Sequence, residues 1–92
     1  VYFWGNIDYS GFRAFVRLKN IISSLQPMNM DILAYNRYKD RGLKKNDNYI
    51  AKLLLLNENP DYDVFSDVIE AIADGKTTVE QESFLEHCLA AI

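Results

Sequence analysis

Two oxygen-bearing side chains, those of Asn6 and Asp8, stand at alternate positions directly after an apolar run at the start of the chain. The run, residues 1–4, is aromatic or β-branched throughout, which favours a strand buried on both faces. Side chains at i and i+2 of an extended segment point the same way, and parallel α/β sheets bind ligands outside the carboxyl ends of their strands. Because carboxylate and carboxamide oxygens suit a hard cation, this stretch predicts a Mg²⁺ or Mn²⁺ site.

Basic side chains form a second group that could do chemistry. Arg13 and Arg17 share one side of a helical pattern, and Arg37 and Lys39 are interleaved with tyrosines in another. Cations beside aromatic rings can bind a nucleic-acid backbone, although a solvated amphipathic helix shows the same pattern. Both interpretations stay open, and the functional one is that these four residues bind DNA.

The elements expected to position these residues alternate between strands and helices. A strand at 1–4 precedes a helix at 10–25, in which apolar residues recur at helical spacing. A second strand is expected at 28–30, followed by a helix at 32–41 that Gly42 ends.

The remainder of the chain predicts further helices joined by loops. Residues 44–48 are polar and without period, which indicates a loop. Residues 50–56 fit a short helix or a buried strand, and their leucines favour the helix. Asn59 and Pro60 signal the start of another helix, and a last helix is expected over 77–92.

Cap residues are expected at four of these helix starts, and Asn59 is the cap of the helix that Pro60 begins. Ser10 suits the N-cap of the first helix. Asp31 is either the N-cap of the next helix or a further oxygen near the metal, and the cap is favoured because Asp is a strong N-cap residue. Thr77 and Glu80 match a capping box, which is the structural interpretation of Glu80.

Size and composition indicate one domain over residues 1–92. The chain starts at Val1 without an initiator Met, which suggests the C-terminal part of a longer protein. A net charge of −3 does not favour nonspecific nucleic-acid binding, but it does not exclude a nuclease with an acidic metal site. The single cysteine, Cys88, cannot form an internal disulfide, which favours a reducing cytoplasm. No apolar run is long enough to span a membrane.

Two blocks of the sequence, residues 2–12 and 78–82, together resemble a known family. The first reads Tyr-Phe-Trp-Gly-Asn-Ile-Asp-Tyr-Ser-Gly-Phe. It is similar to the Tyr-Trp-Gly-Asp-Ile-Asp-x-x-Gly-Phe signature of the C-terminal Toprim domain in JetD, the nuclease subunit of the Wadjet anti-plasmid systems. The second reads Thr-Val-Glu-Gln-Glu and is similar to the Leu-Glu-Gln-Glu run of that family.

The resemblance implies an α/β fold in which a Toprim-like parallel sheet is flanked by helices, shared more distantly with the topoisomerase VI A subunit. This chain would be a C-terminal fragment with few strands and several helices. The implied metal ligands are Asn6, Asp8, Glu80 and Glu82, and the implied catalytic residues are Asp8, Glu80 and Glu82. Asn6 departs from the family pattern, which has an aspartate there, and its amide carries no charge.

The function implied by the resemblance is Mg²⁺- or Mn²⁺-dependent DNA cleavage in anti-plasmid defence, with DNA, a condensin-like complex and a second copy of the chain as partners. The alternative is a degenerate Toprim module that binds DNA or a condensin-like partner without cutting, because Asn6 replaces an acidic ligand. A third interpretation is a small interaction domain in which Asp8 and Glu80 are only turn and cap residues.

Overall fold

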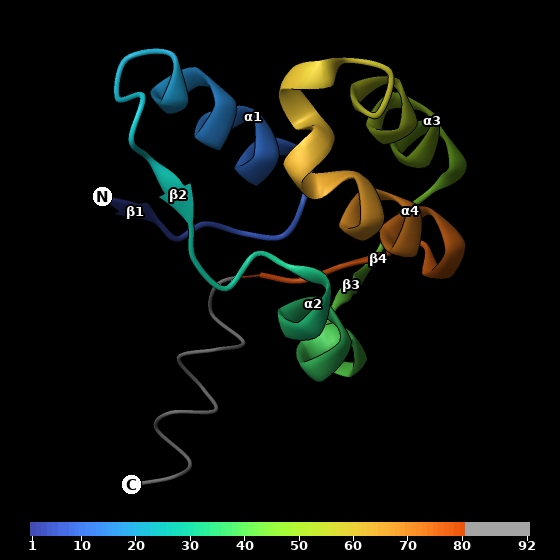
Figure 1. Ribbon diagram of the computed structural model, residues 1–92. Coiled ribbons are helices and arrows are strands. Elements are labelled where there is room, and N and C mark those ends of the chain that lie inside the picture. Colours follow the sequence, from blue (N-terminus) through green and yellow to red (C-terminus); the bar gives the residue numbers. More distant parts are fainter. Residues whose placement is uncertain (81–92) are drawn as a thin grey trace, which may run out of the picture.

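The computed structural model describes residues 1–80 as a mixed helix-and-strand domain (Figure 1). Its elements, in chain order, are β1 (Tyr2–Phe3), α1 (Tyr9–Lys19), β2 (Gln26–Pro27), α2 (Ile32–Tyr38), the 3-10 helix η1 (Lys39–Arg41), β3 (Leu43–Lys44), α3 (Asp47–Leu56), the 3-10 helix η2 (Pro60–Phe65), α4 (Ser66–Gly75) and β4 (Thr77–Thr78). The extended segments cross the middle of the molecule, with α2 on one side and the other helices on the opposite side. The predicted mixture of helices and strands is therefore confirmed.

A parallel pair, β1 and β2, opens the fold. The backbone amides of Gln26 and Met28 donate to β1-side carbonyl oxygens at 2.9 and 2.8 Å. Pro27 lies between these two donors, so its missing N–H costs the ladder no hydrogen bond. The strand predicted at 28–30 is wrong in position, because the residues that pair with β1 are Gln26 and Pro27.

Antiparallel pairing links β3 to β4 and continues beyond β4. Ile7 and Val79 form a bridge in which each amide donates to the other's carbonyl oxygen, at 2.8 and 3.2 Å. The capping box expected at Thr77 and Glu80 is therefore wrong at its first residue, since Thr77 is a buried strand residue. Among the described strand pairs β1–β2 is the parallel one, so a Toprim-like parallel sheet stays a proposal.

The first helix, α1, differs from its prediction at both ends. Asp8 and not Ser10 is its N-cap, and the helix ends at Lys19, well before residue 25. The residues that follow include two β-branched isoleucines and two serines, which are weaker helix formers than leucine or alanine. The ammonium group of Lys19 donates to the Leu25 carbonyl oxygen at 2.8 Å and holds this turn against the helix end.

Side-chain caps set the other helix starts. Asp31 caps α2 by accepting from the Ala34 amide at 2.9 Å, which confirms the favoured interpretation of that residue. Asn46 caps α3, so the helix predicted at 50–56 is confirmed and begins inside the stretch predicted as a loop. Asn59 caps η2, and the α-helix expected after Pro60 starts only at Ser66.

An aromatic group joins the helices in the core. Phe12 and Phe15 of α1 pack on Phe65, with ring centroids 4.5 and 5.2 Å away. Phe3 reaches this group through Phe15, but Tyr2 is 72% exposed, so the expected burial of the first strand on both faces is wrong. No helix within residues 1–80 is both long and apolar enough to cross a membrane.

Candidate functional site

The Ile7–Val79 bridge brings the two acidic stretches of the sequence side by side. In an antiparallel register with Ile7 opposite Val79, Asn6 lies opposite Glu80 and Asp8 opposite Thr78. Three of the four residues predicted as metal ligands therefore lie on adjacent backbone segments. The fourth, Glu82, lies outside the described residues.

Asp8 has a structural task as well as a place in this site. Its Oδ1 accepts a hydrogen bond from the Gly11 amide at 2.7 Å, and its side chain is largely buried. Asp8 is thus the N-cap of α1, a role that the sequence predicted for Ser10. A carboxylate has two oxygens with several acceptor positions, so one cap bond leaves acceptor capacity for a further ligand.

Gly11 fits the backbone of the same turn. A Cβ atom added at Gly11 would overlap the backbone carbonyl of Asn6 and come within 3.2 Å of the Asp8 carboxylate. The absence of a side chain thus lets the Asn6 peptide pack directly against the first turn of α1. This packing fixes where Asn6 and Asp8 lie relative to the helix.

Residues 6–11, which carry Asn6 and Asp8, form a turn that we call the acidic turn. Tyr49 connects α3 to this turn. Its hydroxyl oxygen accepts a hydrogen bond from the Tyr9 amide at 2.8 Å. Burial raises the pKa of Tyr49, the bond from Tyr9 opposes that rise, and the negative charges of Asp8 and Glu80 add to it. Asp8 and Glu80 therefore both lie close enough to the Tyr49 hydroxyl for their charges to affect its pKa.

Three cations surround the Tyr9 and Tyr49 rings, and sequence reasoning assigned a function to only one of them, Arg13. The guanidinium of Arg13 lies 5.6 Å from the Tyr9 centroid, and the Lys45 ammonium lies 5.0 Å from that of Tyr49. The Lys52 ammonium lies 4.2 and 5.5 Å from the two centroids. We call these five residues the tyrosine–cation cluster.

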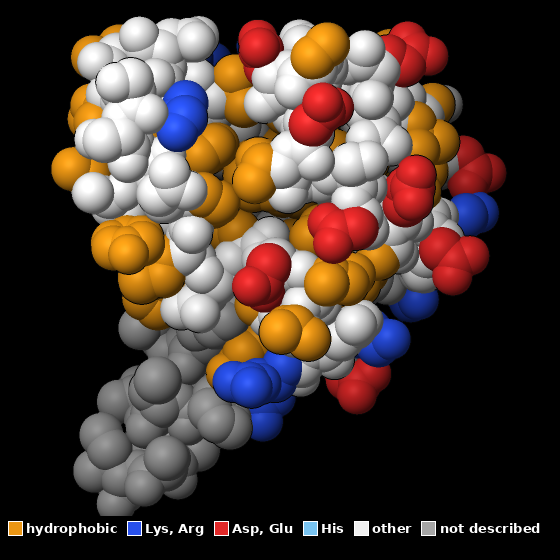
Figure 2. Space-filling view, in the orientation of Figure 1, with side chains coloured by type: hydrophobic (Ala, Val, Ile, Leu, Met, Phe, Trp, Pro, Cys, Tyr) orange, Lys and Arg blue, Asp and Glu red, His pale blue; other side chains and the backbone are white. Residues whose placement is uncertain are grey.

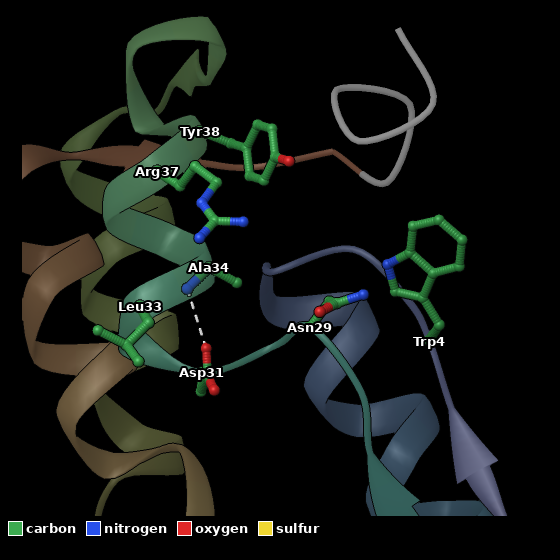
Figure 3. A pocket seen from close by; sticks show the side chains of 7 residues that line it. All are labelled: Trp4, Asn29, Asp31, Leu33, Ala34, Arg37 and Tyr38. Carbon is green, nitrogen blue, oxygen red and sulfur yellow. Dashed lines mark hydrogen bonds between the residues drawn. The ribbon is translucent and has the colours of Figure 1, made fainter. Parts of the chain in front are cut away.

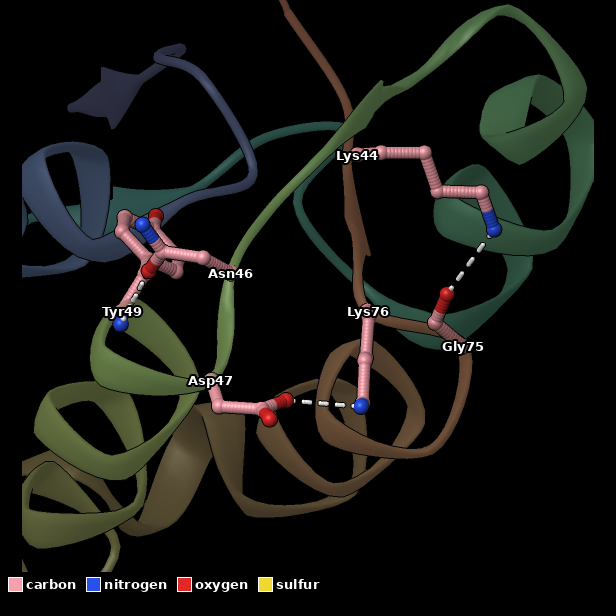
Figure 4. A network of polar contacts seen from close by, with 6 residues as sticks. All are labelled: Lys44, Asn46, Asp47, Tyr49, Gly75 and Lys76. Atoms are coloured by element: carbon pink, nitrogen blue, oxygen red, sulfur yellow. Dashed lines mark hydrogen bonds and ion pairs between the residues drawn. The ribbon is translucent and has the colours of Figure 1, made fainter.

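Local sequence positions the cluster. The Asn46 side chain accepts from the Tyr49 amide at 2.9 Å and begins α3 just after Lys45 (Figure 4). Tyr49 and Lys52 then stand three residues apart on the helix, and Tyr9 and Arg13 stand four apart on α1, spacings that share a helix face. These spacings were the available signal, but the 40-residue separation of the tyrosines hid their contact.

An ion pair joins the first residue of α3 to the residue that follows α4. The Lys76 ammonium lies 2.7 Å from the Asp47 carboxylate, linking the start of α3 to the end of α4 (Figure 4). Its hydrogen bond and positive charge hold the pKa of Asp47 below its usual value. Both side chains are exposed, so the pair contributes little to stability.

The four residues predicted to bind DNA lie on two separate parts of the fold. Arg13 and Arg17 lie on α1, whereas Arg37 and Lys39 lie on α2 and η1, and in Figure 1 the extended segments run between α1 and α2. Arg37 and Tyr38 reach into a cavity of about 280 Å³ opposite Trp4 (Figure 3). A single DNA-binding face made of all four residues is therefore not what the fold presents, although each residue is exposed.

The donor types at the acidic turn fit a hard cation, but the described residues supply only part of a site. Asp8, Glu80 and Asn6 offer carboxylate and carboxamide oxygens, the ligands that Mg²⁺ prefers. Within residues 1–80, however, no group of three His, Cys, Asp or Glu side chains could hold a metal ion. The buried Thr78 hydroxyl, across from Asp8, has no hydrogen-bond partner among the described residues.

The fold and site define a mixed α/β domain with acidic residues at a strand-to-helix turn and at the end of a paired strand. The chain belongs to the JetD C-terminal family: the family described as "Wadjet protein JetD, C-terminal" matches residues 1–91. The Wadjet protein JetD of Bacillus cereus (strain Q1) is 31% identical over 90 residues, which cover 97% of this chain and 22% of that protein. The chain thus spans about a fifth of this relative's length, and no solved structure matches it.

Proposed function

We propose that this domain takes part in metal-dependent DNA cleavage in anti-plasmid defence, with Asp8 and Glu80 as the acidic groups of the site. The observation that carries the proposal is the Ile7–Val79 bridge, which brings both acidic stretches together. Family membership adds the Wadjet context. The Toprim-like sheet, the distant likeness to the topoisomerase VI A subunit, the condensin-like partner, pairing into a homodimer and the cytoplasmic location belong to the same proposal.

The residues have separable roles in such a site. Asp8 and Glu80 would hold a Mg²⁺ or Mn²⁺ ion together with the neutral Asn6 oxygen, and Glu82 is proposed as the next ligand. A bound divalent ion stabilises the negative charge that develops on phosphate oxygens during cleavage. The hydrogen bond between Asp8 and Gly11 orients the carboxylate, and the Tyr49 hydroxyl accepts from the Tyr9 amide next to it.

Calorimetric titration of the full-length protein with Mn²⁺ tests the metal site. We expect binding heat from the wild type and tighter binding from Asn6→Asp, because a third carboxylate adds charge to the ligand set. Asp40→Asn serves as the control, since Asp40 is exposed and lies on η1, outside the acidic turn. No heat from either the wild type or Asn6→Asp would contradict the proposal.

A non-cutting DNA-binding module is the second candidate, and two observations favour it. Asn6 lacks the charge of the aspartate in the family pattern, and Asp8 is already engaged as a cap. Incubating circular plasmid DNA with the full-length protein and Mg²⁺ separates the two candidates. If neither the wild type nor Asn6→Asp nicks the plasmid while both retard it in a gel, the binding role replaces the cleavage role.

A further inference from the structure

We infer that the tyrosine–cation cluster is a binding surface for the DNA phosphate backbone, in which Arg13, Lys45 and Lys52 contact phosphates beside the acidic turn. The inference deepens the proposed function, on which its choice of DNA rests. It adds two cations, Lys45 and Lys52, that were not predicted to contact DNA. It also places the substrate next to Asp8 and Glu80.

The cations converge from three different segments of the chain. Arg13 comes from α1, Lys45 from the turn after β3, and Lys52 from α3. Arg13 and Lys52 approach the same Tyr9 ring, and Lys45 and Lys52 approach the same Tyr49 ring. Tertiary structure, and not one helix face, therefore creates this concentration of positive charge.

The two pairs of cations that share a ring, Arg13 with Lys52 and Lys45 with Lys52, lie close enough for repulsion to matter. The charged groups of Arg13 and Lys52 are no more than about 10 Å apart, because their distances from the Tyr9 centroid set that limit. This separation is about one Debye length at 0.1 M salt, so screening is incomplete. Among the described residues none of the three forms an ion pair, since Lys76 and Asp47 make the pair found there. The negative charge of a polyanion would relieve this repulsion, and release of its condensed counterions would favour binding.

The aromatic pair gives the cluster a fixed shape. The Tyr9 and Tyr49 rings meet edge to face with centroids 6.4 Å apart, and the Tyr9 amide donates to the Tyr49 hydroxyl. Cation–ring attraction holds flexible lysine side chains over these rings. The charged groups are therefore positioned before a ligand arrives, which lowers the ordering cost of binding.

The acidic face formed by η2 and α4 disfavours the approach of DNA from that side. Figure 2 shows acidic side chains spread over the region of η2 and α4, and these elements carry Asp61, Asp63, Asp67, Glu70 and Asp74, all exposed. A polyanion is repelled there. In contrast, the cluster contains three cations. The carboxylates near it are those of Asp8 and Glu80, whose charges raise the pKa of Tyr49.

The test measures binding of the full-length protein to a short double-stranded DNA in EDTA, at several salt concentrations. The double variant Lys45→Gln with Lys52→Gln should weaken binding on the order of tenfold and lower the slope of log K against log salt by about two. Lys52→Gln alone should lower the slope by about one. Arg41→Gln, which removes an exposed cation on η1, is the matched control and should leave the slope unchanged.

A charge-preserving variant separates charge from shape. Lys45→Arg with Lys52→Arg should bind DNA like the wild type, and thermal melting should show that all variants are folded. Wild-type affinity and slope in the folded double Gln variant, an equal loss in the double Arg variant, or no DNA binding by the wild type would each overturn the inference. Charge-dependent binding by a wild type that does not nick DNA would support the inference and contradict the cleavage proposal.

Discussion

At the scale of single residues, Asp8 shows why one position can satisfy two interpretations. A carboxylate before a helix is a strong N-cap, and the same oxygens are good ligands for a divalent ion. The sequence identified Asp8 as a functional candidate but placed the helix cap on Ser10. Serine and aspartate are both strong N-cap residues, so residue type alone does not decide between positions 8 and 10. Asn6 and Asp8 were predictable from their types and spacing, whereas the contact with Tyr49 was not.

Gly11→Ala should destabilise the domain, because the added methyl group would overlap the Asn6 carbonyl and displace the acidic turn. Overpacking of this kind costs about 1–3 kcal/mol of unfolding free energy. Urea unfolding of the full-length protein measures the loss. Gly75→Ala is the matched control, since its Cβ would meet only the Tyr35 hydroxyl at 3.7 Å. Equal stability of the two variants would show that the turn does not pack as described.

Tyr49 should report the two carboxylates through its ionisation. In the double variant Asp8→Asn with Glu80→Gln, two negative charges are lost and the pKa of Tyr49 should fall toward its ordinary value, with burial still raising it. Asparagine retains the cap, so α1 should stay intact. The pH dependence of the Tyr49 ring carbon shift in NMR measures the change, and Asp40→Asn should not reproduce it. An unchanged pKa would mean that Asp8 and Glu80 do not approach this hydroxyl.

At the scale of elements, local signals predicted helices better than strands. Asp31 and the leucines of α3 carry their information within one or two turns, so the α2 cap and the existence of α3 were both predicted. Each described strand has two residues, and its partner is distant in sequence. Thr77 was predicted as a helix cap for that reason, because only pairing with β3 makes it a strand residue.

Tyr35 should hold β4 against α2. Its hydroxyl donates to the Thr77 carbonyl oxygen at 2.8 Å in a buried setting, so Tyr35→Phe should lower the unfolding free energy by about 1 kcal/mol. Burial, followed by the charge of Asp74, raises the pKa of Tyr35 above 10.0. The protonated form is thus favoured in the folded state, and its contribution is complete below pH 10 and is lost as pH rises through the folded pKa.

Denaturant unfolding at pH 8 and above pH 10 checks both parts of this prediction. The wild type should lose more stability than Tyr35→Phe between the two pH values, because phenylalanine cannot ionise. Tyr2→Phe is a control at an exposed ring. Identical pH dependence in the wild type and Tyr35→Phe would contradict the assigned role of the hydroxyl.

At the scale of the whole molecule, separation of charge is the feature that composition concealed. A net charge of −3 argued against nonspecific binding of nucleic acid, yet the acidic residues of η2 and α4 account for five negative charges away from the tyrosine–cation cluster. Formal charge is a sum over the chain and carries no positions. Lys45 and Lys52 were overlooked because Lys45 lies in a stretch predicted as a polar loop and Lys52 stands among leucines, and only the fold brings them to the same pair of tyrosine rings as Arg13.

The most direct test of the central claim is cleavage of circular plasmid DNA by the full-length protein with Mg²⁺. Asp8→Asn and Glu80→Gln are compared with Asp40→Asn and Glu58→Gln, which remove the same charges at exposed positions. We predict nicking by the wild type and both controls, and a loss of roughly a hundredfold in rate for each of the first two variants. Wild-type rates in Asp8→Asn and Glu80→Gln, or no nicking by any form, would contradict the account.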